Sequence, residues 1–535
     1  MRFSLCLGVW CVVIVYKPCP LNPGTSSSHD EDMDSSATQA HAQQPLAMDA
    51  EQFRALGHSL VDQIASQLAS IPHGPVTRNE SPSAVRAAMG LNGGLPEEGT
   101  DAATLLATTA THLFEHSLFN AHPRFLGYIT SSAAPIGILG DLLASALNPN
   151  VGAWILSPAA SEIEAQTIRW IAELTGYPTD CGGILVSGGN MANFVCFLAA
   201  RAARAGWDIR RDGVAGSPRQ LVAYASQETH TWIQKAADLA GLGTASIRWI
   251  ETDDRLRMDV AALERAVAAD VADGRVPFIV IATAGSVSTG AVDPISEIAR
   301  VCQERGIWLH VDGAYGGVAA AVPGVPDDLR ALGLADSVAV DPHKWLYAPL
   351  EAGCALVRKP AALRGAFSYH PAYYHFDEHG TNFVDYGPQN SRGFRALKVW
   401  LALKQVGAAG YRRMIAGNMA LSRALAEAVE RNPDLQLQTQ GLSIATFRFV
   451  PADLRSSAGD EAVVAYLNRL NEALLDKIQR GGEAFVSNAV LGGRYVLRAC
   501  IVNIHTTPED VEAIPEIVVR LGRELDIQMR PTLPV

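Results

Sequence analysis

Short apolar runs alternate with amphipathic segments through the middle of the chain. The runs are shorter than helices and lack the polar alternation of half-exposed strands, so they predict strands buried on both faces. We predict six such strands, at Gly183–Val186, Leu221–Ala225, Phe278–Thr283, Trp308–Asp312, Ser337–Asp341 and Cys354–Val357. Helical spacing of apolar residues predicts helices between them, near 191–205, 230–240, 259–272 and 294–305. This alternation indicates an α/β domain whose mostly parallel sheet is covered by helices on both faces.

The two ends of the chain follow other patterns. Apolar residues recur at helical spacing from Asp49 to Leu68, and a second helical segment follows near 101–118. After residue 397 the predicted elements are a long helix near 410–431, a strand at Ser443–Phe449, a helix near 459–480, strands near 483–488 and 494–503, and a helix from Pro508. We therefore predict a helical N-terminal arm over 48–133, a large domain over 134–397 and a small C-terminal α+β domain over 398–535.

The first 47 residues do not fit this scheme. An apolar run from Phe3 to Tyr16 follows Arg2, but it is shorter than the roughly 20 residues that a membrane-spanning helix needs. It is similar to a signal-peptide core, without a clean small-residue cleavage site after it. Residues 22–47 are rich in Ser, Gln, Ala and acidic residues, which is typical of disorder. We interpret residues 1–47 as a disordered or hydrophobic extension, with an export signal as the alternative.

Composition limits the partners that we expect. The chain has 535 residues, of which 48% are hydrophobic and 18% charged, as in a globular protein of several domains. Its net charge of -12 disfavours phosphate backbones and anionic lipids, so we expect no nucleic-acid partner and no stable membrane partner. The 8 cysteines show neither metal-ligand spacing nor a disulfide pattern. We therefore predict reduced thiols in a cytoplasmic protein, and no metal site.

Two motifs predict a binding site at the start of helices. Ser187–Asn193, with the sequence Ser-Gly-Gly-Asn-Met-Ala-Asn, follows a strand and opens a helix. Its glycines could close backbone N–H groups on an anion, although an ordinary glycine turn has the same pattern. His230 follows the strand Leu221–Ala225, and its imidazole could stack on a ligand ring or be a structural histidine.

Two further motifs predict reactive groups at strand ends. Asp312 ends an apolar strand and precedes the small residue Ala314, so its carboxylate could pair with a pyridinium nitrogen or cap a helix. Lys344 follows His343, and in a partly dry pocket its pKa would be lowered and its amine could form a Schiff base. A surface lysine after a turn is the alternative. All four motifs come after strands, where parallel sheets bind their ligands.

Taken together, these motifs resemble the group II pyridoxal-phosphate-dependent amino-acid decarboxylases. This family includes the aromatic-L-amino-acid, histidine and glutamate decarboxylases. Trp308–Gly317 and Asp341–Leu346 are similar to its two most specific motifs, and the start at Met48 resembles the aromatic decarboxylases. The resemblance implies pyridoxal 5'-phosphate as cofactor and the α/β PLP-dependent transferase fold type I, with a mostly parallel seven-stranded-type sheet. It also implies a domain-swapped homodimer with a shared active site.

The resemblance assigns roles to individual positions. Lys344 would be the Schiff-base lysine, and Asp312 would bind the pyridine nitrogen. His230 and Ala314 would contact the two faces of the ring, with Ser286 near it. The phosphate would be bound by Gly189, Asn190 and His343, together with Ser391 from the other subunit. The family often has Ser or Thr in place of Asn190, which weakens only the side-chain contact there. Tyr128 lies where the family's substrate pocket begins.

A polar, aromatic stretch at 368–390 resembles the family's mobile catalytic loop. Tyr373 best matches the tyrosine that returns a proton to the substrate, with assistance from His230, and Tyr374 is the alternative. A surface loop with aromatic anchors would have the same composition.

The implied function is decarboxylation of an L-amino acid to its amine and carbon dioxide. Aromatic substrates are favoured, although Gly152 and Ala153 are small where some aromatic-specific relatives have bulkier residues. Glutamate, aspartate, diaminobutyrate or another aliphatic amino acid are alternatives. An aldehyde synthase typically has Phe in place of the loop tyrosine, so Tyr373 favours simple decarboxylation. An aminotransferase would need a keto acid, and a degenerate binding scaffold would not retain Lys344.

Overall fold

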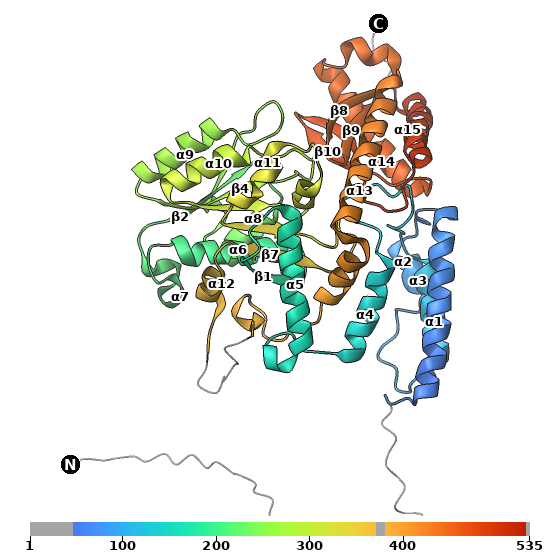
Figure 1. Ribbon diagram of the computed structural model, residues 1–535. Coiled ribbons are helices and arrows are strands. Elements are labelled where there is room, and N and C mark those ends of the chain that lie inside the picture. Colours follow the sequence, from blue (N-terminus) through green and yellow to red (C-terminus); the bar gives the residue numbers. More distant parts are fainter. Residues whose placement is uncertain (1–45, 371–379, 531–535) are drawn as a thin grey trace, which may run out of the picture. The chain divides into compact units, whose positions relative to one another are not determined.

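The computed structural model describes residues 46–370 and 380–530. Contacts within the chain divide it into two units, residues 1–59 and 60–535. The first unit contributes the start of helix α1 (Ala50–Ser70). The second contains all the other elements labelled in Figure 1. Among the described residues, no helix combines the length and the apolar character that a membrane crossing requires.

A seven-stranded sheet forms the centre of the larger unit. Its order is β1-β7-β6-β5-β4-β2-β3. The strands are β1 (Gly182–Val186), β2 (Leu221–Ser226), β3 (Ile247–Ile250), β4 (Val276–Thr283), β5 (Trp308–Asp312), β6 (Ser337–Val340) and β7 (Gly353–Val357). Only β7 is antiparallel to its neighbours, and every residue of β1, β2, β5, β6 and β7 is buried. The predicted α/β class and the six predicted strands are confirmed.

Helices precede, separate and follow these strands. They are α2 (Pro82–Ala88), α3 (Ala102–Glu115), α4 (Pro135–Leu147), α5 (Pro158–Thr175), α6 (Gly189–Arg204), α7 (Ile209–Asp212), α8 (Trp232–Leu239), α9 (Val260–Ala272), α10 (Ile295–Arg305), α11 (Asp327–Arg330) and α12 (Pro360–Phe367). Helix α6 packs against β1, β4, β5, β6 and β7, and α9 and α10 pack against β4. The sheet is therefore covered on both faces, as predicted.

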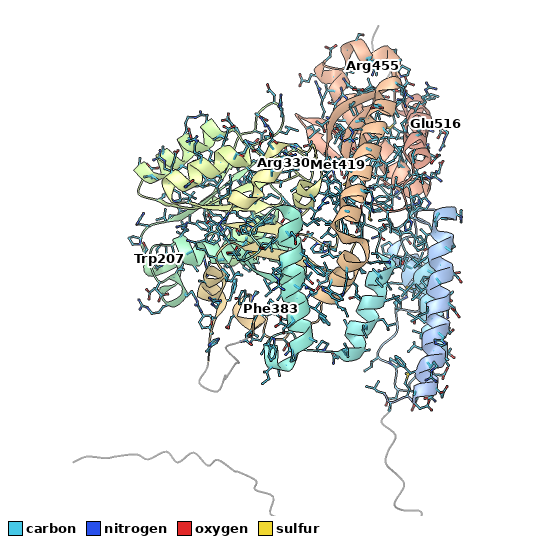
Figure 2. All side chains as sticks on the ribbon, viewed as in Figure 1. Trp207, Arg330, Phe383, Met419, Arg455 and Glu516 are labelled. Atoms are coloured by element: carbon cyan, nitrogen blue, oxygen red, sulfur yellow. The ribbon has the colours of Figure 1, made fainter. Side chains whose placement is uncertain are left out.

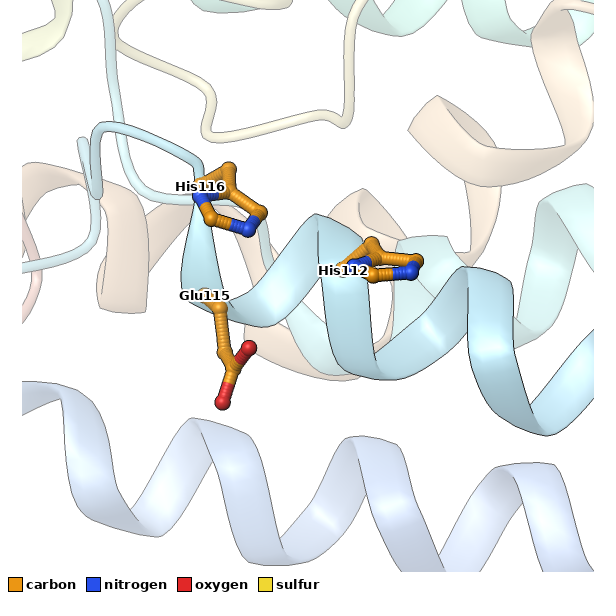
Figure 3. Close-up of side chains that lie close together, drawn as sticks. All are labelled: His112, Glu115 and His116. Atoms are coloured by element: carbon orange, nitrogen blue, oxygen red, sulfur yellow. The ribbon is translucent and has the colours of Figure 1, made fainter. Parts of the chain in front are cut away.

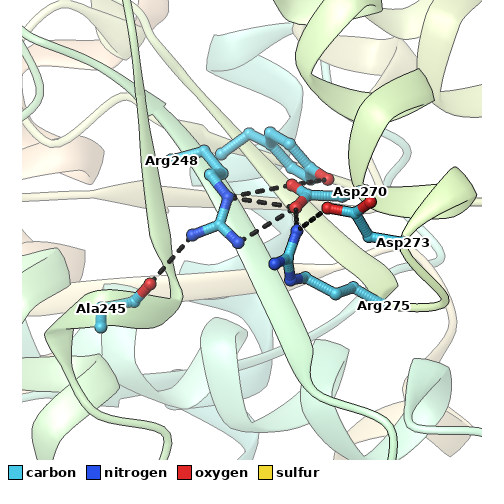
Figure 4. Close-up of polar contacts among 6 residues, drawn as sticks. Ala245, Arg248, Asp270, Asp273 and Arg275 are labelled. Carbon is cyan, nitrogen blue, oxygen red and sulfur yellow. Dashed lines mark hydrogen bonds and ion pairs between the residues drawn. The ribbon is translucent and has the colours of Figure 1, made fainter.

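A buried carboxylate fixes the outer part of this sheet. Asp270, near the end of α9, accepts hydrogen bonds from Tyr224 Oη on β2 at 2.8 Å, Arg248 Nη2 on β3 at 3.0 Å and Arg275 Nη1 at 2.8 Å (Figure 4). Burial alone would raise the pKa of Asp270, but hydrogen bonds from Arg248, Tyr224 and Arg275 outweigh it and lower that pKa. Asp270 therefore remains charged and attaches α9 to the edge strands.

The C-terminal part has a second sheet. Its order is β10-β11-β9-β8, all antiparallel, and its elements are α13 (Ala396–Arg431), β8 (Leu435–Gly441), β9 (Ile444–Phe449), α14 (Glu461–Gly481), β10 (Ser487–Leu491), β11 (Arg494–Cys500) and α15 (Pro508–Met529). Figure 1 shows α14 and α15 beside this sheet. An α+β pattern was predicted here, but β8 was not, and the strand expected near 483–488 begins only at Ser487.

Helix α13 differs most from the prediction. It begins at Ala396, and a non-helical kink at Gly407, with a φ of 67°, separates a first helical segment that was not predicted from a second that matches the helix predicted near 410–431. Glycine adopts this left-handed conformation without the steric cost of a side chain. The predicted boundary between 397 and 398 thus falls inside α13, and the division into arm, large domain and small domain remains a prediction.

Candidate active site

The four sequence motifs meet in one cavity of about 580 Å³ at the carboxyl ends of the central strands. Seven predicted site residues line it: Gly189, Asn190, His230, Asp312, Ala314, His343 and Lys344. Asp312 ends β5, and Lys344 follows the end of β6 by four residues. Because β1, β5 and β6 point in the same direction, their carboxyl ends bring these side chains to the same edge of the sheet.

Lys344 is paired with a carboxylate that the sequence argument did not consider. Its Nζ lies 2.9 Å from Asp341 Oδ2. Burial lowers the pKa of Lys344, but the charge and hydrogen bond of Asp341, with a contribution from Asp312, outweigh burial and raise this pKa. The expectation of a lowered pKa was therefore wrong for the chain alone, since Asp341 is three residues earlier in the same turn.

Gly188 and Gly189, in the turn that opens α6, pack against His343 and Asp341. A Cβ on Gly188, whose φ is +131°, would lie 3.0 Å from His343 Cε1, and a Cβ on Gly189 would lie 2.5 Å from Asp341 Oδ2. His343 Nδ1 accepts a hydrogen bond from the Ala352 N–H at 3.0 Å, so its Nε2 carries the proton. Burial lowers the pKa of His343, with partial compensation from Asp341. The absence of side chains at Gly188 and Gly189 therefore lets this turn pack directly against His343 and Asp341.

Asp312 is held at both carboxylate oxygens. Its Oδ1 accepts a hydrogen bond from the Ala314 N–H at 3.1 Å, and its Oδ2 accepts one from Trp232 Nε1 at 2.7 Å. His230 lies on the adjoining loop, where its Nδ1 accepts the Trp232 backbone N–H at 3.2 Å. Burial lowers the pKa of His230, while the charge of Asp312 opposes this effect. Contacts within the protein thus orient both groups.

A chain of hydrogen bonds continues from the cavity into the sheet. His310 Nε2 bonds to Asn193 Oδ1 at 2.7 Å, and His310 Nδ1 to Ser337 Oγ at 2.9 Å. Since Trp308 Nε1 already donates to Ser337 Oγ at 2.8 Å, the Ser337 hydroxyl donates to His310, which then donates to Asn193. Burial lowers the pKa of His310 to about 4. The neutral ring therefore sets which end of the Asn193 amide faces the cavity.

The sequence argument missed three residues of this site. Thr283, at the end of β4, lines the cavity, and its Oγ1 has no hydrogen-bond partner among the described residues. Arg498, on β11, also lines it and donates to Ser487 Oγ at 2.7 Å and to the Tyr128 carbonyl at 3.3 Å. Trp232 is the third. Trp232 stands beside His230 in the motif Thr229–Trp232, and Thr283 ends a predicted strand, but neither was assigned a role. Arg498 belongs to no motif, and only tertiary folding brings it to the cavity.

Some predicted residues lie elsewhere. Ser286 is buried but does not line the cavity, because its Oγ lies 3.0 Å from Thr289 Oγ1 and closes the turn between them. Ser391 is exposed and does not line this cavity either. The resemblance had assigned it to the active site of the other subunit. Tyr373 and Tyr374 fall outside the described residues.

The segment after Ser391 is fixed by a buried ion pair. Arg392 pairs with Glu164 and donates to the carbonyls of Val151 at 2.7 Å and Leu185 at 2.6 Å. Its guanidinium lies 5.0 Å from the ring centre of Phe383, which is labelled in Figure 2. Arg392 follows the proposed catalytic loop in the chain. Its hydrogen bond to Leu185 therefore attaches this part of the chain to strand β1.

Another polar cluster lies outside the cavity, on and just after α3. His112, Glu115 and His116 lie close together (Figure 3), with potential ligand atoms within 4.8 Å of one another. However, His116 Nδ1 is already 2.7 Å from Glu80 Oε2, and Glu115 is exposed. We assign this cluster a structural role, in which His116 attaches the end of α3 to the loop before α2.

Comparison with known proteins identifies similar chains. The pyridoxal-dependent decarboxylase conserved domain matches residues 85–450. An aromatic-L-amino-acid decarboxylase of Bacillus atrophaeus is 34% identical over 487 residues, covering 90% of this chain and 98% of that protein. A phenylacetaldehyde synthase of a Rosa hybrid cultivar is 30% identical over 88% of this chain and 93% of its own length. The crystal structure of Oryza sativa TDC with PLP and tryptamine has a TM-score of 0.82 and 29% identity, covering 91% of this chain and 100% of that one.

Proposed function

The chain belongs to the pyridoxal-dependent decarboxylase family, and on that premise we propose that it converts an aromatic L-amino acid to the amine and carbon dioxide. It is a PLP-dependent amino-acid decarboxylase of fold type I. The observation that carries the proposal is a single cavity. It is lined by Lys344, Asp312, His343 and the glycine turn at Gly188 and Gly189.

The residues present fit pyridoxal 5'-phosphate. Gly188 and Gly189 line the cavity at the start of α6, where backbone N–H groups suit an anionic group, and a Cβ on either would collide with His343 or Asp341. The hydroxyl of Thr283 and Oδ1 of Asp341 are buried without partners among the described residues. Buried polar atoms of this kind are normally paired, and a bound group with polar edges would supply their partners.

The proposed roles of the chain's residues follow from these positions. Lys344 would hold the cofactor covalently, and Asp312 would pair with its ring nitrogen. Ala314 and His230 would contact the two ring faces, and Gly189, Asn190 and His343 would bind the phosphate together with Ser391 of the partner subunit. When bound, this cofactor supplies an electron sink for the charge left on the substrate carbon.

Proton movement is assigned to His230 and to a tyrosine of the segment 368–390. Burial keeps the His230 ring neutral near pH 7, so its Nε2–H can donate. Tyr373, which lies outside the described residues, would return a proton to the substrate carbon, with Tyr374 as the alternative. Among the described residues, Lys344 and Arg498 are the Lys and Arg side chains that line the cavity. Because Lys344 is assigned to the cofactor, Arg498 is the side chain suited to orient the substrate carboxylate.

Two observations bear on the substrate. Tyr128 and Val287 give the cavity an apolar wall that suits an aromatic side chain, and the relative from Bacillus atrophaeus is an aromatic-L-amino-acid decarboxylase. Gly152 and Ala153 do not line the cavity. A Cβ on Gly152 would lie 2.3 Å from the Asn390 carbonyl, so its small size is required by packing and says nothing about the substrate.

We also propose that the chain forms a homodimer with a shared active site. Helix α4 packs against α13 through Gly137 and Gly140, and its other side exposes four leucines: Leu139, Leu142, Leu143 and Leu147. A contiguous apolar surface of this kind usually marks an interface. Light scattering after gel filtration should give twice the chain mass, and Leu142→Glu together with Leu143→Glu should give monomers of low activity.

The decisive experiment is an amino-acid panel with products detected by mass. Tyr, Trp, Phe and dihydroxyphenylalanine should give amine and carbon dioxide in equal amounts without added keto acid, and Lys344→Ala should give neither. Aldehyde and hydrogen peroxide in place of amine would identify an aldehyde synthase. Turnover of glutamate or aspartate alone, or a requirement for keto acid, would refute the proposal.

A further inference from the structure

Trp232 is the first residue of α8, and it contacts two groups of the site at once. Its indole Nε1 donates to Asp312 Oδ2 at 2.7 Å, while its backbone N–H donates to His230 Nδ1 at 3.2 Å. We propose that Trp232 is a positioning residue, whose indole N–H orients the Asp312 carboxylate and stabilises its charge for pairing with the cofactor's ring nitrogen. This inference rests on the function proposed above.

The two oxygens of Asp312 explain why an N–H donor is needed there. Asp312 is 7% exposed, so its carboxylate oxygens are largely removed from water and need partners within the protein. The Ala314 N–H at Oδ1 and the Trp232 N–H at Oδ2 satisfy both oxygens and block rotation of the carboxylate. An indole donates and cannot accept, so Trp232 requires an unprotonated oxygen at the Oδ2 position.

Aromatic packing prevents the indole from turning away. Trp232 is 1% exposed. Its ring meets Phe197 edge-on, at a centroid distance of 6.3 Å and 83°, and His310 in the same way at 5.7 Å and 88°. These contacts come from α6 and β5, so two rigid elements fix the direction of the N–H. The indole therefore has little side-chain freedom, and its N–H is held toward Asp312 Oδ2.

Trp232→Phe is the direct test, because it removes the indole N–H and retains the backbone N–H to His230. Trp400→Phe is the matched control, since Trp400 Nε1 donates to Gln166 Oε1 at 2.7 Å and the residue does not line the cavity. Apoprotein is titrated with pyridoxal 5'-phosphate and bound cofactor is measured by absorbance. We expect about tenfold weaker binding for Trp232→Phe, equivalent to about 1.4 kcal/mol, and unchanged binding for the control.

Three further readouts separate positioning from a merely structural role. In the loaded enzyme, kcat should fall about tenfold with little change in KM for the amino acid, because Trp232 does not line the cavity. In the Asp312→Asn background, Trp232→Phe should cost little further cofactor affinity, since no charge remains to be stabilised. Melting temperatures of the apoproteins should fall alike for Trp232→Phe and Trp400→Phe.

Phe197→Leu gives an independent route if Trp232→Phe does not fold. It leaves the N–H in place and removes one of its two aromatic contacts, so a smaller loss of cofactor affinity is expected. Wild-type affinity in Trp232→Phe or Phe197→Leu, or an equal loss with and without Asp312→Asn, would overturn the inference. Failure of the wild-type protein to bind the cofactor would instead overturn the proposed function.

Discussion

His310 should make the folded protein lose stability in mild acid. Its ring is fully buried, and burial lowers its pKa to about 4 from an ordinary 6.5. At about 1.4 kcal/mol for each pH unit, this difference corresponds to about 3 kcal/mol. Because the folded-state pKa is the lower one, the contribution is fully present above pH 6.5 and is lost as pH falls toward 4. Between pH 7.5 and pH 5 the loss is about 2 kcal/mol.

The assay compares urea unfolding of wild type and His310→Gln at pH 7.5 and pH 5, at one protein concentration. The free energy of unfolding of wild type relative to the variant should fall by about 2 kcal/mol at pH 5. Asp293→Asn is a control of opposite sign, because burial raises the pKa of Asp293 to about 6 and its contribution grows on acidification, by about 1.4 kcal/mol. If the free energies of unfolding of wild type and His310→Gln differ by the same amount at both pH values, the reasoning is refuted.

Three other changes give measurable outcomes. Gly189→Ala should weaken binding of pyridoxal 5'-phosphate at least tenfold in equilibrium dialysis, because its Cβ would lie 2.5 Å from Asp341 Oδ2; unchanged affinity would exclude this turn as the phosphate site. Arg392→Met should lower the free energy of unfolding by about 3–5 kcal/mol, since it leaves Glu164 buried and unpaired, and adding Glu164→Gln should restore part of it. Arg498→Gln should raise KM for the amino acid about tenfold with a smaller effect on kcat in initial-rate measurements, and an unchanged KM would argue against its contact with the carboxylate.

The sequence predicted elements well where local pattern and burial agree. Strands β1, β2, β4, β5, β6 and β7 are short, apolar and buried, so periodicity was sufficient. Strand β3 was missed because it has four residues, and Trp249 within it is 40% exposed. The helix near 410–431 was predicted, but the helical segment that precedes the kink at Gly407 was missed.

Site residues divide in a similar way. Lys344, Asp312 and Gly189 could be found because strand ends and glycine turns mark them in the sequence. Arg498 and Trp232 could not, since their roles depend on side-chain contacts with residues far along the chain. The pKa of Lys344 was misjudged for the same reason, because burial was considered without the nearby charge of Asp341.

The bond from Arg498 to the Tyr128 carbonyl has a mechanical consequence. Tyr128 adopts a φ of 51°, uncommon for a residue with a side chain, and Arg498 on β11 bonds to its carbonyl. The floor of the cavity belongs to the central sheet, whereas this stretch of its rim is attached to a separate sheet. Any tilt of the C-terminal sheet would therefore displace the Tyr128 backbone and the Arg498 guanidinium together.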